Sequence, residues 1–268
     1  MELNDEQFQR YARHLILDEV GDEGQEKLLA SKVLVIGAGG LGSPLLLYLA
    51  AAGVGTLGIV DDDDVELSNL QRQIAHESNA VGLSKVESAA ASVARINPGV
   101  RIEKHTERLT AGNAARLFGG YDLIADGSDN FETRFLVNDA CYLAKKTLVS
   151  GAILRFDGQL STFKAHEGGT NPCYRCVFPE APPPGQIPTC AEAGVLGSLC
   201  GVVGSLQATE IIKEITGAGD SLSGALLIID GLSTTFRRVG IKPDPACALC
   251  GPRPRIRDLS AHVKTTAL

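Results

Sequence analysis

The sequence has 268 residues, of which 44% are hydrophobic and 21% charged, and its formal net charge is −7 at pH 7. This composition is ordinary for a globular protein, and the acidic balance argues against non-specific nucleic-acid binding, which needs a basic surface. The polar N-terminus lacks the apolar segment of a signal peptide. The most apolar stretch, residues 194–206, is too short to cross a membrane. We therefore expect a cytoplasmic protein with neither a membrane nor a nucleic acid as partner.

Helices and strands are predicted to alternate over the first 150 residues. The predicted helices cover residues 4–17, 22–30, 41–53, 84–97 and 131–144. The predicted strands cover residues 32–37, 56–60, 121–125 and 147–151, and residues 101–105 alternate only weakly. Strands that alternate with helices indicate βαβ units, so the fold class is α/β, with an open, doubly wound, Rossmann-like and mostly parallel sheet.

The pattern changes near residue 152. A strand is expected over residues 159–164, in a different setting from the earlier strands. Residues 166–192 are rich in proline, glycine and cysteine and predict a long loop, which in a compact domain is usually functional or disordered. A long buried helix over about 194–216 and C-terminal strands over 225–230 and 234–239 complete the expected elements.

The turn after the first predicted strand, G37-A-G-G-L-G42, fits the pattern G-x-G-x-x-G. Gly37 permits the tight turn, Gly39 lets the backbone approach a phosphate, and Gly42 lets the helix and strand pack closely. Asp61 ends the second strand, where a carboxylate accepts hydrogen bonds from ribose hydroxyls. These residues predict a nucleotide site without choosing between NAD and ATP. The alternative is a glycine turn required only for packing.

Charged side chains at three successive strand ends favour a triphosphate. Arg72, with Asn69 and Gln73 nearby, is suited to orient phosphate oxygens, and Lys85 could supply a point charge. Asp129 follows the next strand at the same edge of the sheet and suggests Mg2+. Each has a structural alternative: Arg72 could pair with an aspartate of residues 61–64, Lys85 could lie on the surface, and Asp129 could cap the following helix.

This combination of motifs resembles the MoeB/ThiF/HesA family, the bacterial relatives of ubiquitin-activating enzymes. The matching segments, which occur in order between about residues 6 and 251, are G37-A-G-G-L-G42, V60-D-D-D-D64, L67-S-N-L-Q-R72, G82-L-S-K-V-E87 and S128-D-N130. Two further segments are similar to the MoeB branch: G151-A-I-L-R-F-D-G-Q159, and C190-A-E-A-G-V195 followed by G204-S-L-Q-A208.

The resemblance implies a homodimeric enzyme that uses ATP to adenylate the C-terminal glycine of a small ubiquitin-like sulfur carrier protein. The carrier would be MoaD-like, end in Gly-Gly and serve molybdenum cofactor biosynthesis. The residues that would contact ATP and its Mg2+ are Gly40, Asp61, Ser68, Asn69, Leu70, Gln71, Arg72, Lys85, Asp129 and Asn130. Arg13 matches an arginine that reaches the partner subunit's ATP, although it could also be an ordinary solvated arginine.

The resemblance also implies the domain organisation. Residues 1–251 would form a single adenylation domain, with a nucleotide-binding half over about 1–150 and a carrier-binding and zinc half over about 151–251. Residues 252–268 exceed the core motif set, so they are expected to be a disordered C-terminal tail.

Cys173, Cys176, Cys247 and Cys250 form two C-x-x-C pairs. Four thiolates in paired knuckles predict a tetrahedral zinc site with a structural role, and the family has the same pairs. The alternative, a redox C-x-x-C, explains only one pair.

The remaining cysteines differ from one another. Cys141 and Cys200 fall in apolar helices and are expected to be small core residues. Cys190 comes just before a predicted helix, where a thiol can have a lowered pKa, so it is a candidate nucleophile. The five histidines show no catalytic spacing and receive no role.

Three alternative functions remain open at this stage. A ThiF-like enzyme would activate a ThiS-like carrier for thiamine thiazole synthesis. An NAD-dependent oxidoreductase would account for the glycine turn and Asp61 but not for Arg72, Lys85 and the paired cysteines. A non-catalytic scaffold would not need the intact phosphate-binding set.

Overall fold

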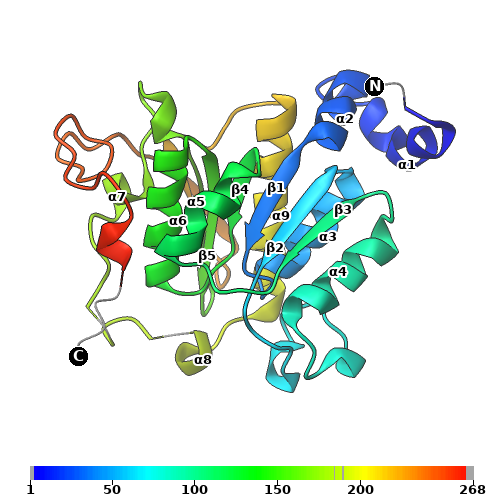
Figure 1. Ribbon diagram of the computed structural model, residues 1–268, viewed down its shortest axis with the longest axis horizontal. Helices are drawn as coiled ribbons and strands as arrows, with labels where there is room; N and C mark the ends of the chain where they lie inside the picture. Colours follow the sequence, from blue (N-terminus) through cyan, green and yellow to red (C-terminus); the bar gives the residue numbers. More distant parts are fainter. Residues whose placement is uncertain (1–2, 184, 189, 264–268) are drawn as a thin grey trace.

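One eight-stranded sheet organises the chain (Figure 1), and the computed structural model describes residues 3–183, 185–188 and 190–263. The strand order is β3-β2-β1-β4-β5-β6-β7-β8. The strands are β1 (Lys32–Ile36), β2 (Thr56–Val60), β3 (Arg101–His105), β4 (Leu123–Asp126), β5 (Thr147–Leu154), β6 (Asp157–Phe163), β7 (Ala225–Asp230) and β8 (Thr235–Gly240). The first five strands pair in parallel, and β5 to β8 pair antiparallel. The predicted mostly parallel α/β fold with a C-terminal strand region is therefore confirmed.

The helices connect the strands and cover both faces of the sheet. They are α1 (Asp5–Leu15), α2 (Gly21–Ala30), α3 (Gly42–Ala52), α4 (Lys85–Ile96), α5 (Ala111–Gly119), α6 (Phe131–Ala144), α7 (Tyr174–Val177), α8 (Cys190–Ala193) and α9 (Gly197–Thr216). The sequence pattern did not predict α5, which contains two glycines and is only nine residues long. Its start carries a capping box in which Thr110 and Asn113 exchange hydrogen bonds, and this is the signal that could have located it.

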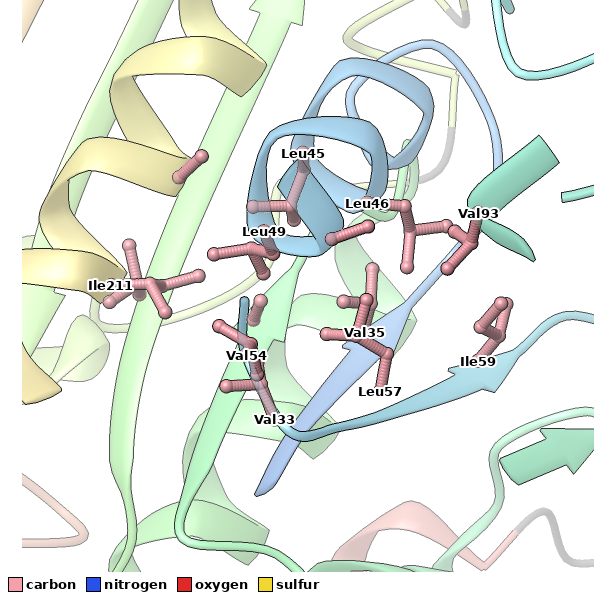
Figure 2. Close-up of a cluster of buried hydrophobic side chains, with 14 of the residues drawn as sticks. Val33, Val35, Leu45, Leu46, Leu49, Val54, Leu57, Ile59, Val93 and Ile211 are labelled. Atoms are coloured by element: carbon pink, nitrogen blue, oxygen red, sulfur yellow. The ribbon is translucent and has the colours of Figure 1, made fainter. Parts of the chain in front are cut away.

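Alternation along the strands divides the core into two layers. Val33 and Val35 of β1 face α3, α4 and α9, whereas Leu34 and Ile36 face α5 and α6. Figure 2 shows the first layer, in which Leu45, Leu46 and Leu49 of α3 point toward the strands. The continuous apolar strands suit a parallel sheet that is covered on both sides. None of the helices in the described ranges combines the length and apolarity that a membrane crossing requires.

The expected C-terminal tail is ordered as far as residue 263, so the prediction that it is disordered was wrong for this part. The backbone N–H groups of Arg255 and Ile256 donate to the carbonyl of Ala248 at 2.8 and 2.9 Å. His262 then contacts a carboxylate oxygen of the buried Asp139 through its Nε2 at 2.8 Å. Local sequence could not show this anchor, because it joins residues that are 123 positions apart. Residues 264–268 lie outside the described part of the chain.

Candidate functional site

A cavity of about 300 Å³ lies at the carboxyl edge of the parallel strands. Its walls come from the turns after β1, β2 and β4 and from the first residues of α4 and α6. In open α/β sheets this edge is where ligands bind. The predicted site residues that line the cavity are Gly37, Gly39, Gly40, Asp61, Arg72, Lys85, Asp129 and Asn130.

The glycine turn has the geometry that its pattern predicts. Gly37 has a φ of +90°, which favours glycine. A Cβ on Gly42 would lie 1.9 Å from the carbonyl oxygen of Gly37, so close packing excludes any side chain there. A Cβ on Gly39 would meet no neighbouring protein atom closer than 3.6 Å. Packing therefore does not require Gly39 to be glycine, which fits a position that leaves room for a ligand.

Asp61 is oriented by the backbone on two sides. Its Oδ2 accepts from the N–H of Ala38 at 2.8 Å, and its Oδ1 accepts from the N–H of Asp63 at 2.9 Å. Burial raises the pKa of the Asp61 carboxyl, whereas these two bonds and the charge of Lys85 oppose that increase. The carboxylate is thus held at the end of β2 and faces the cavity.

Four basic side chains line the cavity, Arg72, Lys85, Arg108 and Arg134, and the first two are predicted site residues. Lys85 opens α4, is only 7% exposed, and pairs its Nζ with Oδ2 of Asp63 at 2.7 Å. The alternative that Lys85 lies on the surface is therefore wrong. Arg72 donates from Nη1 to the carbonyl of Ser68 at 3.1 Å, and within the described residues it forms no ion pair with the aspartate run. Its charge stays available to a ligand.

Asp129 and Asn130, which are neighbours at the start of α6, have different roles. The side chain of Asn130 is the N-cap and accepts from the N–H of Thr133 at 2.9 Å. Asp129 is exposed at the cavity wall and does not cap the helix. The Asp129 carboxylate accepts only a long contact from Nδ2 of Asn130, at 3.5 Å, among the hydrogen bonds between described residues, so it can face a ligand or a cation.

Several predicted contacts lie outside the cavity wall. Ser68 and Asn69 belong to a 3-10 turn, in which the Asn69 side chain accepts from the N–H of Glu66 at 3.3 Å. The predicted residues that do not line the cavity are Gly42, Ser68, Asn69, Leu70 and Gln71. The turn instead brings Arg72 and Gln73 to the wall. The buried Asn69 side chain therefore stabilises the turn that leads to Arg72.

His76 is a site residue that the sequence did not reveal. Its Nε2 lies 2.9 Å from the carbonyl oxygen of Ala38, and its Nδ1 lies 2.9 Å from Oγ of Ser88 in α4. Burial lowers the pKa of this imidazole, so the neutral form is favoured at pH 7. In the tautomer that suits these partners, Nε2–H donates to Ala38 and Nδ1 accepts from Ser88. His76 therefore holds the glycine turn in place through the carbonyl of Ala38.

Arg13 lies far from this cavity. It is exposed on α1, which packs where α3 and α4 end: Tyr11 contacts Asn97, and Arg10 Nη1 donates to the carbonyl of Ile96. The cavity lies at the opposite ends of these two helices, and an 11-residue helix is about 16 Å long. In Figure 1, α1 lies beside α2 at the upper right of the view. Arg13 is therefore not placed to contact the cavity of its own chain.

A second cavity of about 450 Å³ adjoins the first. Its walls are mostly apolar and come from α6, from the antiparallel β5–β6 hairpin and from the proline-rich loop, including Phe131, Phe135, Phe178 and Ile187. The residues that line both cavities are Asp129, Arg134 and Ile153. The arrangement joins a polar, glycine-lined cavity to an apolar one through a short shared wall.

The four predicted metal-ligand cysteines come together at one place. The Sγ atoms of Cys173 and Cys247 are 3.5 Å apart, those of Cys176 and Cys250 are 3.3 Å apart, and Cys173 lies 3.4 Å from Cys250. A tetrahedral zinc with Zn–S bonds of about 2.3 Å requires sulfur–sulfur distances of about 3.8 Å. Small adjustments would satisfy this distance, so the cluster is consistent with a zinc site.

The other three cysteines lie in different surroundings. Cys141 is buried in α6, where burial raises the pKa of its thiol well above the usual value, and it is the small core residue that was predicted. Cys200 is also buried, but its sulfur faces Gly40 at the cavity wall. Cys190 opens the short helix α8, and its side chain lies outside the described residues.

Comparisons with known proteins agree with this fold. The profile of the ThiF family matches residues 11–249. A Thermus thermophilus protein named sulfur carrier protein adenylyltransferase is 50% identical over 256 residues, which cover 95% of this chain and 94% of that protein. The Mycobacterium tuberculosis protein named probable adenylyltransferase/sulfurtransferase MoeZ is 54% identical over 247 residues, and the match covers 91% of this chain but only 62% of MoeZ. A crystal structure of E. coli MccB is similar to this fold, with a TM-score of 0.80 and 21% sequence identity. The aligned region covers 90% of this chain and 74% of the MccB chain, and the two share the same fold.

We predict that His76 supports nucleotide binding through the glycine turn. His76→Leu should weaken nucleotide binding about tenfold, because the buried Ala38 carbonyl loses its donor. His76→Gln retains a donor and should change the affinity less than about threefold. Calorimetric titration with nucleotide measures both affinities. Equal affinities for the two variants and the native chain would contradict this role.

We also predict that the four-cysteine cluster holds one metal ion per chain. Cys247→Ser should reduce the bound zinc measured by elemental analysis and should lower the unfolding temperature, because metal binding contributes to folding. Cys141→Ala, at the buried cysteine outside the cluster, is the matched control and should retain full zinc. Equal zinc content in both variants would show that the cluster is not the metal site.

Proposed function

The chain belongs to the ThiF family, and we propose that it uses ATP to adenylate the C-terminal glycine of a small ubiquitin-like sulfur carrier protein. The observation that supports this most directly is the pair of adjoining cavities. One has a glycine turn, four basic side chains that suit a triphosphate and exposed carboxylates that suit its Mg2+, and the other is an apolar slot that suits an extended peptide end. The names of the similar proteins fit this activity.

The polar cavity suggests how ATP would lie. Its ribose would meet Asp61, whose two oxygens are already oriented by backbone donors. Its phosphates would follow the glycine turn toward the start of α3, where helix N–H groups favour anions. Arg72 and Lys85 would neutralise phosphate oxygens. Asp129 is suited to hold the Mg2+ that accompanies ATP, which would supply further neutralisation of phosphate charge.

The reaction we propose joins two anions. The terminal carboxylate of the carrier, with a pKa of about 3.5, is ionised at neutral pH and needs no general base. One of its oxygens bonds to the α-phosphorus, the bond from the α-phosphorus to the bridging oxygen breaks, and pyrophosphate leaves with that oxygen. Two unit charges 4 Å apart repel by about 4 kcal/mol at an effective dielectric constant of 20. Positioning and neutralisation are therefore the main tasks of the site.

Formation of a homodimer would complete this site. Arg13 lies at the far end of α3 and α4 from its own cavity, so it can contribute only to the cavity of another copy. The family resemblance gives this arginine that role. We therefore propose that each nucleotide site contains Arg13 from the partner subunit, which agrees with the closed symmetry of most soluble oligomers.

The cysteine cluster would hold zinc in a structural role. Four thiolates leave no open coordination position for a substrate. The cluster joins the segment before α7 to the segment after β8, and Ile256 of the C-terminal segment packs against it. Bound zinc would contribute to folding stability. The adenylation reaction would take place at the two cavities and not at the zinc site.

The proposed carrier is MoaD-like and places the enzyme in molybdenum cofactor biosynthesis. This assignment rests on the segments that resemble the MoeB branch, 151–159 and 190–208. A ThiS-like carrier for thiamine thiazole synthesis is the competing partner. The two carriers share the Gly-Gly end that the cavities would recognise. Discrimination between them by the enzyme would therefore depend on the folded part of each carrier.

We predict ATP–pyrophosphate exchange with a MoaD-like carrier and not with a ThiS-like carrier, measured with purified protein and Mg2+. Asp129→Asn should lower exchange by at least about 100-fold, because it removes the carboxylate that would hold Mg2+ at the phosphates. Asp18→Asn, at an exposed aspartate near α1, is the matched control and should leave exchange unchanged. Exchange with the ThiS-like carrier alone would move the enzyme to thiazole synthesis. Binding of NADH without any exchange would contradict the adenylation proposal.

We predict that Arg13 acts on the partner subunit. Arg13→Ala and Asp129→Asn should each be inactive alone, whereas an equal mixture of exchanged subunits should recover about a quarter of the native activity. Half of the dimers would then be mixed, and each would contain one complete site. A mixture of Arg13→Ala with the Arg13→Ala/Asp129→Asn double variant is the control, because it contains no complete site. Equal activity in both mixtures would exclude a contribution across the interface.

A further inference from the structure

Arg134 lies in the wall that separates the two cavities. It comes from the first turns of α6, is 8% exposed and borders both cavities. Arg72 and Lys85 border only the polar cavity. Among the residues that the structure describes, Arg134 is therefore the cation at the junction, where a peptide end in the apolar cavity would meet a nucleotide.

The guanidinium of Arg134 is held by neutral acceptors. Its Nη1 donates to the carbonyl of Gly151 at 3.1 Å, and its Nη2 donates to the carbonyl of Ser128 at 2.6 Å. These contacts fix the guanidinium between the turn after β4 and the middle of β5. They employ two of its five N–H donors, so donors remain for another acceptor.

The neighbouring carboxylates do not neutralise this buried charge. Within the described ranges no carboxylate oxygen lies within 4.0 Å of the Arg134 nitrogens. Asp126, fully buried nearby, accepts from Ser128 and from Oγ of Ser150. Arg175, by contrast, is bonded through Nε and Nη2 to Asp139. Buried charges are normally paired, so Arg134 is suited to receive an anion from a ligand.

We propose that Arg134 binds the C-terminal carboxylate of the carrier and holds it at the junction for attack on the α-phosphorus; this inference rests on the proposed function. A planar guanidinium matches a carboxylate in geometry and charge. During the attack one carboxylate oxygen forms the new bond to phosphorus, and pyrophosphate leaves with the electron pair of the broken bond. No proton moves, and Arg134 remains charged throughout.

The test compares two forms of one MoaD-like carrier, one ending in the glycine carboxylate and the other in the glycine amide. The native enzyme with a non-hydrolysable ATP analogue should bind the carboxylate form about tenfold more tightly. In Arg134→Gln this preference should fall below about twofold, while the affinity for the ATP analogue stays unchanged. Arg134→Lys retains the charge and should retain an intermediate preference.

A purely structural role for Arg134 gives a different result. If the guanidinium only joins β4 to β5, Arg134→Gln will unfold at a lower temperature or bind both carrier forms more weakly, with the tenfold preference intact. That outcome overturns the proposal. So does a native enzyme that binds the two forms equally, whatever the variants do.

Failure of the proposed function is recognised separately. A native enzyme that prefers the carboxylate form, loses this preference in Arg134→Gln and still catalyses no pyrophosphate exchange would support the carboxylate contact and contradict adenylation. Exchange by the native enzyme together with an unchanged preference in the variants would support adenylation and reject Arg134 as the carboxylate ligand.

Discussion

The position of the Ala38 backbone is the constraint on which the polar cavity depends. Its N–H donates to Asp61 at the end of β2, and its carbonyl accepts from His76, which contacts Ser88 of α4. The close approach of Gly42 to the Gly37 carbonyl then sets the direction in which α3 begins. The two peptide groups that flank Ala38 thus link the Asp61 carboxylate, the glycine turn and the helix that carries Lys85. A shift there would move all three, because buried polar groups have few alternative partners.

The change from parallel to antiparallel pairing places the second cavity beside the first. Parallel strands bring the ends of β1, β2 and β4 to one edge, whereas β5 continues past that edge to Leu154 and returns as β6. Gln207 of α9 supports this transition, because its Nε2 donates to the carbonyls of Asp126 and Val149 at 2.8 and 3.0 Å. Arg134 joins the turn after β4 to the middle of β5 from the α6 side. Hydrogen bonds from helices on both faces of the sheet therefore hold the junction.

Sequence pattern predicted the parts of the site that follow from strand order. Asp61 directly follows β2 and Asp129 lies in the turn after β4, and parallel strands end at one edge, so their proximity follows from the fold class. Lys85 follows the predicted N-cap Ser84 and was located for that reason. His76 and Arg134 were missed because their roles depend on carbonyls of distant residues, Ala38 and Gly151. Every residue has a backbone carbonyl, so the sequence does not indicate which carbonyl a distant side chain will contact.

The charge distribution suits the two anionic substrates that we propose for this acidic protein. The net charge of −7 describes the whole chain, but in the described residues four cations, Arg72, Lys85, Arg108 and Arg134, border the two cavities. Burial strengthens their interaction with an anion because less water screens it. Formation of the acyl-phosphate bond removes the charge of the carboxylate that we assign to Arg134. The attraction that holds the carrier end during the attack is then weaker in the product, so the same charge would favour binding before adenylation and release after it.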